Sequence, residues 1–180
     1  MALTLKQVCE KVRDKFPKAS PTIVECAGDP YVVVAADAIV EICRWLRDDP
    51  EMKFDLCSSI AGQDDTKDFW VVYHLYSVPK NQRVVLKVKA APREEPVVPS
   101  VVSVWKAADW HEREAYDMYG IRFEGHPDLR RIYLYEEFVG YPLRRDYPKE
   151  KRQPLVRRDD LLAKPPRAPI DDDDEEVRDA

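Results

Sequence analysis

The chain has 180 residues, 44% of them hydrophobic, which is enough to bury a core in one domain with or without a tail. Its net charge of −5 is uneven, because the last ten residues hold seven acids and one arginine while the other 170 residues carry a net charge of +1. A nearly neutral body lacks the concentrated basic face that nucleic-acid binding requires. We therefore expect no nucleic-acid partner.

The sequence offers no pattern for a metal or a cofactor. The four cysteines, at positions 9, 26, 43 and 57, form no CxxC motif and no Cys/His cluster, so zinc and iron–sulfur ligation are not indicated. Neither GxGxxG nor GxxxxGK[ST] occurs, so these nucleotide and flavin sites are not encoded. We expect no catalytic, cofactor-binding or metal-binding residue in this chain.

Targeting and membrane signals are also missing from the sequence. The start of the chain shows neither a secretory signal pattern nor an Arg/Ser-rich presequence. The longest apolar runs, such as residues 31–36, are too short to span a bilayer. We expect a cytosolic protein that reaches a membrane only through a partner.

The first third of the chain predicts two helices around two short strands. Thr4 and Gln7 have the spacing of a capping box, and Pro17 ends the helix that it begins. Residues 22–26 and 31–34 are β-prone. Asp37 is expected to cap a second helix, whose apolar stripe ends before Asp48-Asp49-Pro50. Cys9 and Cys43 lie on the apolar helix faces and are expected to be buried.

The next third predicts a meander of three strands. Residues 69–78 are apolar on both faces, which is typical of a central strand with His74 in the core. Residues 84–90 alternate between apolar and basic side chains, and residues 79–82 make the hairpin. The strand before them is expected to place these residues on one face: Phe54, Leu56, Ser58 and Ile60.

These elements predict an α+β fold, a two-layer domain with helices on one face of a small mixed sheet. We expect three regions: an α+β body over residues 1–91, a linker with a signature helix and arginine-bearing turns over 92–148, and an extended or disordered charged tail over 149–180.

The signature helix is predicted over residues 110–119. Asp109 precedes it with capping-box spacing, and Gly120 follows where a left-handed residue is needed. Arg113 is placed to pair with Asp117 one turn later, so much of this motif is accounted for by capping and by surface ion pairs.

Two features of this region exceed capping and surface pairing. The helix carries more bulky aromatic surface than it can bury against itself, and Trp, Tyr, Met and Arg are enriched at interface cores. Residues 123–131 and 138–145 also repeat the pattern Phe-x-Gly-aromatic-Pro followed by Leu-Arg-Arg. Paired guanidinium groups suit the recognition of carboxylates or carbonyls on a neighbouring protein.

Catalytic interpretations of the same residues are weaker. His111-Glu112 begins an HExxH-like pattern, but Ala115 stands where the second histidine is required. A hydrolase that uses Glu112 and Glu114 would require a concave pocket around the two carboxylates. Exposed, paired acids are the favoured interpretation of Glu112, Glu114 and Asp117.

The segment Glu112-Arg113-Glu114, Asp117, Met118-Tyr119, His126, Arg130, Ile132-Tyr133, together with the closing residues 140–148, resembles the C-type (30-kilodalton-type) hydrophilic subunit of respiratory complex I, NADH:quinone oxidoreductase. The resemblance covers residues 35–148. It implies a non-catalytic structural subunit of the peripheral arm, docked on the quinone-site (49-kilodalton-type) subunit and near the iron–sulfur subunits. It also implies that FMN and iron–sulfur clusters belong to other subunits, and that the complex lies on the cytoplasmic face of the bacterial inner membrane.

The residues expected at this interface combine the motif with the arginine-bearing turns. They are Trp110, Glu112, Arg113, Glu114, Asp117, Tyr119, His126, Arg130, Arg131, Tyr141, Arg144 and Arg145. Two alternatives stay open, an equivalent subunit of a membrane-bound hydrogenase or other-donor complex, and a free-standing adaptor domain.

Overall fold

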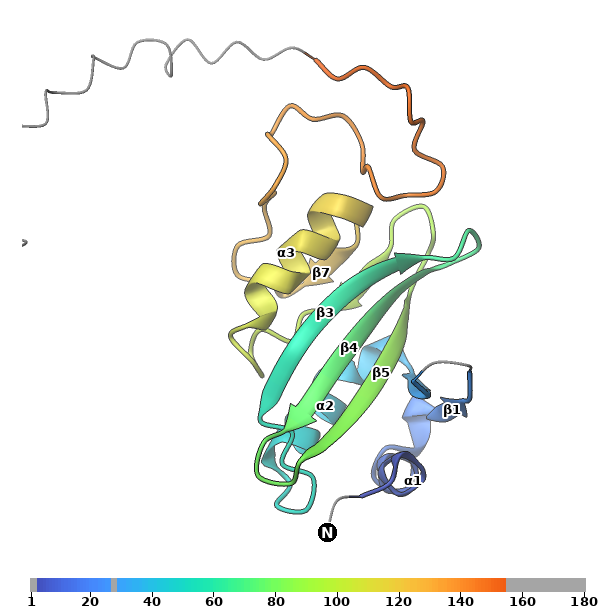
Figure 1. Ribbon diagram of the computed structural model, residues 1–180, viewed down its shortest axis with the longest axis vertical. Helices are drawn as coiled ribbons and strands as arrows, with labels where there is room; N and C mark the ends of the chain where they lie inside the picture. The colour runs from blue at the N-terminus through green and yellow to red at the C-terminus, as the bar shows by residue number, and fades with distance from the viewer. Residues whose placement is uncertain (1–2, 27–28, 155–180) are drawn as a thin grey trace, which may run out of the picture.

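The computed structural model describes residues 3–26 and 29–154, and its architecture is the predicted α+β fold (Figure 1). A five-stranded sheet has the strand order β1-β2-β5-β4-β3. Its strands are β1 (Thr22–Val24), β2 (Tyr31–Val34), β3 (Leu56–Asp64), β4 (Phe69–Ser77) and β5 (Gln82–Ala90). The sheet is mixed, because β2 and β5 run parallel while the other pairs are antiparallel.

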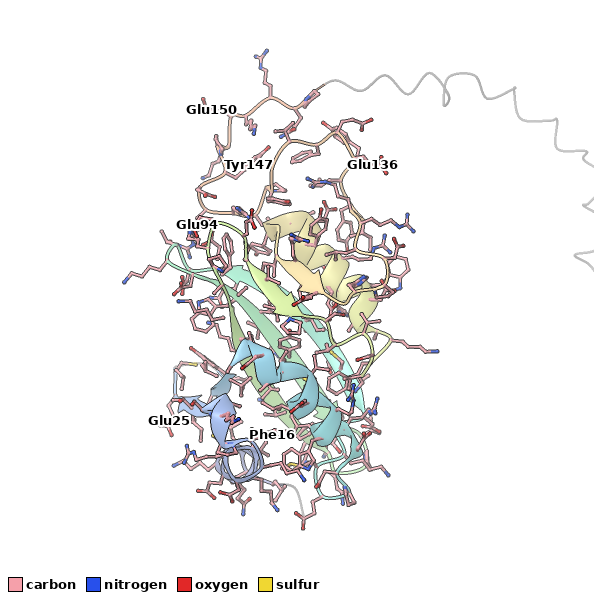
Figure 2. All side chains as sticks on the ribbon, turned by 180° about the vertical axis from the view of Figure 1, so that it is seen from behind. Phe16, Glu25, Glu94, Glu136, Tyr147 and Glu150 are labelled. Carbon is pink, nitrogen blue, oxygen red and sulfur yellow. The ribbon has the colours of Figure 1, made fainter. Side chains whose placement is uncertain are left out.

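All three α-helices lie on one side of the sheet, as the view from behind shows (Figure 2). They are α1 (Leu5–Lys15), α2 (Ile39–Asp48) and α3 (Ala108–Tyr119), and short 3-10 turns cover Pro17–Ala19 (η1) and Ala36–Ala38 (η2). A second, two-stranded parallel ladder joins β6 (Val97–Pro99) to β7 (Arg122–Glu124). None of the helices within the described residues is long and apolar enough to cross a bilayer.

The two predicted helix starts in the first third of the chain differ in outcome. The capping box of α1 is present, because the Gln7 amide donates to Thr4 Oγ1 and the Thr4 amide donates to Gln7 Oε1. The expected cap at Asp37 is wrong. Asp37 lies inside η2, whose 3-10 turn leads directly into α2, so the amide of Ile39 bonds to the carbonyl of Ala36 and no side chain is needed.

A β-bulge changes the predicted face of β3. The register with β4 shifts between Cys57 and Ser59, so Cys57 and Ile60 both face the core. Leu56 is consequently turned outward and is 44% exposed. The expectation that Phe54, Leu56, Ser58 and Ile60 share one face is therefore wrong, because one extra residue reverses the alternation.

Strand β4 lies between β3 and β5, which confirms the predicted central position. Its inward residues, such as Tyr73 and Leu75, are buried, whereas Trp70, Val72 and Tyr76 on the other face are only half-buried. His74 is exposed on that face, so its predicted place in the core is wrong. All three helices cover the opposite face, and nothing in the described part of the chain covers this one.

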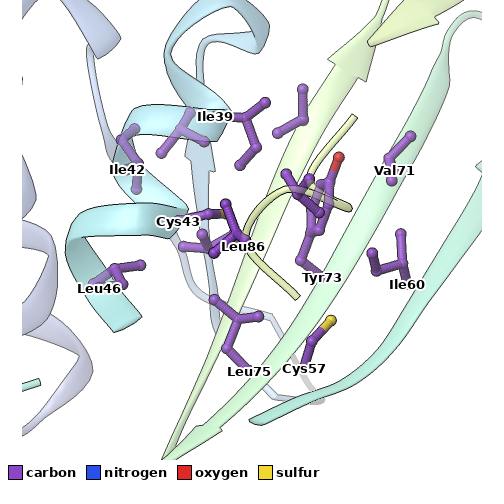
Figure 3. Packing of buried hydrophobic residues seen from close by; sticks show 14 of the residues in the cluster. Ile39, Ile42, Cys43, Leu46, Cys57, Ile60, Val71, Tyr73, Leu75 and Leu86 are labelled. Atoms are coloured by element: carbon purple, nitrogen blue, oxygen red, sulfur yellow. The ribbon is translucent and has the colours of Figure 1, made fainter. Parts of the chain in front are cut away.

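The core fills the layer between the helices and the sheet (Figure 3). Ile39, Ile42 and Leu46 of α2 are fully buried against β4 and β5, and burial of such a side chain contributes about 1.5–3 kcal/mol. Cys9 and Cys43 are buried as predicted. The same core continues beyond residue 91 through these buried residues: Val98, Val101, Trp105, Ala108, Ala115, Ile121 and Phe123. The part of the predicted tail from residue 155 onward lies outside the described residues.

Candidate functional site: helix α3 and the segment that covers it

The signature helix, α3, begins two residues earlier than predicted. Its first residue is Ala108, and no side chain caps its N-terminus, so the expected cap at Asp109 is wrong. A turn closed by the Asp109 amide and the Lys106 carbonyl at 3.2 Å precedes the helix and replaces the cap. The C-terminus is as predicted, because Gly120 has φ 72° and its amide donates to the Tyr116 carbonyl at 2.8 Å.

Glu112 lies fully buried on the inward side of α3, so the expectation of an exposed acid is wrong. The Ser100 hydroxyl donates to Glu112 Oε2 at 2.6 Å, and the Val101 amide donates to Oε1 at 2.7 Å. Burial raises the pKa of Glu112 to about 7, although these two hydrogen bonds oppose the shift. Glu112 therefore joins α3 to the turn after β6, at a place that no substrate can reach.

Asp117 is also fully buried, on the side of α3 that faces residues 130–134. The amides of residues 132–134 all donate to its Oδ2, at 2.8 to 3.1 Å, and Arg131 Nη1 donates to Oδ1 at 2.7 Å. Burial alone would raise the pKa of Asp117, but these backbone and guanidinium donors hold it below its usual value. The carboxylate thus holds the beginning of the C-terminal segment (residues 125–154) against the helix.

Arg113 does not pair with Asp117, so the predicted i,i+4 ion pair is wrong. Its Nε donates to the carbonyl of Arg130 at 3.2 Å and its Nη2 to the carbonyl of Arg131 at 3.4 Å. The guanidinium also lies 5.1 Å from the ring centroid of Trp110. Both ends of the expected pair are therefore bonded to the C-terminal segment, because that segment covers this side of α3.

The tyrosine ring of Tyr141 lies between two guanidinium groups of the repeated Leu-Arg-Arg turns. The Cζ atoms of Arg131 and Arg144 are 5.4 and 4.7 Å from its centroid. Arg131 also donates to the carbonyls of Phe138 and Gly140, and Arg144 Nε donates to the carbonyl of Tyr119 at 2.6 Å. One arginine of each repeat is thus bonded within the chain.

A second buried carboxylate, Asp64 at the end of β3, holds the far part of the segment. Arg93 donates to both of its oxygens, and the amides of Thr66 and Arg145 bond to it at 2.8 and 2.9 Å. Burial would raise the pKa of Asp64, but these donors, Arg93 foremost, lower it to about 2. Sequence reasoning missed Asp64, Arg93 and Ser100, because their partners lie 11 to 81 positions away and no local pattern marks them.

His126 is fixed at the start of the C-terminal segment. The amide of Asp128 donates to Nδ1 at 3.0 Å, so Nε2 carries the proton and donates to the carbonyl of Asp109 at 3.3 Å. The carboxylate of Asp109 lies 3.5 Å from the same nitrogen. His126 therefore orients the turn beside α3.

The twelve residues expected at an interface divide by position. Glu112, Arg113 and Asp117 are buried within the chain, and Tyr119, His126, Arg131, Tyr141 and Arg144 are half-buried in it. Trp110, Glu114, Arg130 and Arg145 are exposed. Arg130 pairs with Asp128 at 2.8 Å, and Arg145 uses its amide and Nε on Asp64.

Large apolar side chains are exposed chiefly in this region. Seven of them are exposed among the described residues, and five lie on α3 and the C-terminal segment: Trp110, Tyr133, Tyr135, Val139 and Leu143. Trp110 and Tyr133 are 62% and 67% exposed. Contiguous apolar surface of this kind marks sites of protein association. Within residues 3–26 and 29–154, no group of three or more His, Cys, Asp or Glu side chains could hold a metal ion.

Comparison with known proteins defines the class to which this fold and this network belong. The family model described as "Respiratory-chain NADH dehydrogenase, 30 Kd subunit" matches residues 32–153. The chain belongs to this family, which confirms the resemblance found in the sequence. It is accordingly a subunit of a multi-subunit respiratory oxidoreductase.

Individual relatives all bear the name of the C-type subunit of NADH-quinone oxidoreductase. One from Rhizobium etli is 45% identical over 151 residues, which are 80% of each chain. Another, from Rhizobium meliloti, is 52% identical over 129 residues, 68% of this chain and 70% of that one. The relative from Roseiflexus is 42% identical over 151 residues, 82% of this chain and 86% of that one.

A solved structure shares the fold at low sequence identity. It is a chain of the membrane-bound sulfane sulfur reductase, an archaeal respiratory membrane complex, with a TM-score of 0.66 and 23% identity. The match covers 81% of this chain and 86% of that chain.

Proposed function

We propose that this chain is a non-catalytic structural subunit of the peripheral arm of a proton-pumping NADH:quinone oxidoreductase. It docks through α3 and the C-terminal segment on the quinone-site (49-kilodalton-type) subunit and adjoins the iron–sulfur subunits. FMN and the iron–sulfur clusters belong to those other subunits. The assembled complex lies on the cytoplasmic face of the bacterial inner membrane.

The observation that carries this proposal is where the exposed apolar side chains gather. Five of the seven large ones among the described residues lie on α3 and the C-terminal segment, while the N-terminal half of the chain contributes only Leu56 and Val78. Aromatic anchors at the centre of an interface supply most of the binding energy in protein complexes. This part of the molecule is therefore suited to a protein partner.

The arginines that the sequence suggested for the partner have a first task inside the chain. Arg113, Arg131 and Arg144 donate to backbone carbonyls and so fix a segment that contains little regular secondary structure. A segment held in this way is pre-organised, which lowers the entropy lost on docking. The aromatic side chains then meet the partner from a fixed backbone.

Affinity purification of the tagged chain from detergent-solubilised membranes tests the proposal. We expect mass spectrometry to find the quinone-site and iron–sulfur subunits in the eluate, and the eluate to oxidise NADH with a quinone. Recovery of the chain alone would contradict the proposal and support a free-standing adaptor.

A second candidate is the equivalent subunit of a complex with another electron donor. The fold shared with a chain of the membrane-bound sulfane sulfur reductase favours considering it. Recovery of a quinone-site-type subunit without the NADH-oxidising subunits and without NADH oxidation would select this candidate.

A further inference from the structure

The outward side of α3 presents one stripe of side chains that no other part of the described chain covers. Trp110, Glu114 and Met118 are four positions apart, so they lie along one side of the helix over about 12 Å. Trp110 and Glu114 are exposed and Met118 is half-buried. The backbone joins Leu143, which is 53% exposed, to the end of this stripe through a bond from its amide to the Met118 carbonyl at 3.1 Å.

Glu114 differs from the other acids of the helix. Glu112 and Asp117 are buried and bonded within the chain, and Asp109 adjoins His126. Glu114 is exposed and forms no hydrogen bond or ion pair with any residue in the described ranges. It therefore sets one unpaired negative charge between a tryptophan and a methionine.

A carboxylate at the centre of an apolar surface restricts what can dock there. A purely apolar partner would bury the charge without compensation, which is strongly unfavourable. A second copy of this chain is disfavoured as well, because a two-fold interface across this stripe would bring the two Glu114 carboxylates toward each other. A partner cation opposite Glu114 removes both difficulties.

Building on the proposed function, we propose that the stripe Trp110–Glu114–Met118, with Leu143, docks on another subunit of the complex through an apolar surface that carries an arginine opposite Glu114. An arginine suits the position because its planar fork binds a carboxylate with two hydrogen bonds and packs on an aromatic ring such as that of Trp110. Arginine and tryptophan are also the residue types most enriched where interfaces hold most of their energy.

Charge substitutions at Glu114 test this inference in the assembled complex. The tagged chain, wild-type or variant, is expressed in cells that lack the untagged copy, and the quinone-site subunit recovered per tagged chain is measured by mass spectrometry. We expect Glu114→Lys to lower this recovery about thirtyfold or more, as expected when one member of a buried interfacial pair is lost, and Glu114→Gln to lower it less. Glu124→Lys, on β7, makes the same charge change at another exposed glutamate and is expected to change recovery less than about twofold.

A photo-crosslinking side chain at position 118 identifies the partner surface. We expect the cross-linked peptide to come from another subunit and to contain or adjoin an arginine. Equal recovery for Glu114→Lys and wild type, or a cross-link between two copies of this chain, would overturn the inference while leaving the proposed function intact. Recovery of the wild-type chain without other subunits would instead overturn the proposed function.

Discussion

Asp117 of α3 and Arg131 of the C-terminal segment, fourteen positions apart, form an ion pair at 2.7 Å, and the Asp117 side chain is fully buried. The same carboxylate accepts three consecutive backbone amides, so one residue fixes both the course of the segment and the position of its arginine. The docking surface that we propose is therefore held in place by buried charge inside the chain.

Replacing Asp117 by Asn should release the start of the C-terminal segment. The amide keeps the shape but loses the charge, which leaves Arg131 without its counter-ion and weakens three amide bonds, so we expect a loss of about 3 kcal/mol in the free energy of unfolding. Urea denaturation at pH 7 measures it. Asp128→Asn, at an exposed acid in the same segment, is the control and should change stability little. Equal stability of both variants would show that Asp117 does not hold the segment.

Glu112 should make the protein less stable as the pH rises. Its pKa is about 7 in the folded chain against 4.5 as its usual value, so the folded state holds the proton more tightly. Stability is then full below pH 4.5 and falls as the pH rises toward 7, by about 3 kcal/mol in total. Glu112→Gln keeps a donor and an acceptor for Ser100 and Val101 but does not titrate.

We therefore expect Glu112→Gln to be more stable than wild type at pH 8 and nearly equal to it at pH 5. Thermal unfolding across this range measures the difference, with Glu114→Gln, at the exposed position of the same helix, as the matched control. A Glu112→Gln chain that is less stable than wild type at pH 8 would contradict a buried carboxyl without a cation.

Asp64 should have the opposite dependence on pH. Its folded pKa of about 2 lies below its usual value of 3.8, so its contribution is present above pH 4 and is lost as the pH falls toward 2. We expect Asp64→Asn to lower stability by about 2 kcal/mol at pH 7 and to remove this acid-dependent loss. It should also speed proteolysis near Arg145, whose amide bonds to Asp64. Unchanged proteolysis would show that residue 145 is held by other contacts.

The close approach of α3 to β3 depends on Gly62. A Cβ there would lie 2.5 Å from Tyr119 Cδ2, so Gly62→Ala should displace the ring and cost about 1–3 kcal/mol. Tyr119→Ala should also destabilise, but the double variant should be more stable than the sum of the two losses predicts. Additive losses in urea denaturation would place the strain elsewhere.

Two tryptophans separate folding from docking. Trp105 is 6% exposed and lies in the core, so Trp105→Ala should cost about 3 kcal/mol or more of stability. Trp110 is 62% exposed, so Trp110→Ala should leave the unfolding temperature of the isolated chain nearly unchanged and reduce the recovery of partner subunits. Full recovery of partners with Trp110→Ala would exclude this tryptophan as an anchor.

Short-range patterns in the sequence determined much of this protein. The capping box at Thr4, the alternation of residues 84–90 and the left-handed glycine at 120 depend on neighbours within one or two turns, and the structure confirms each. The family was also legible, because the motif from Glu112 to Tyr133 is a matter of residue identity and spacing.

Only the tertiary structure decided which side of each element is covered. A bulge reversed the faces at Leu56, and the placement of every helix on one side exposed His74. The acids of α3 look alike in sequence, yet Glu112 and Asp117 are buried while Glu114 is exposed. Their partners, Ser100 and Arg131, lie 12 and 14 positions away. Burial and pKa depend on which distant segments meet, and local spacing carries no record of that.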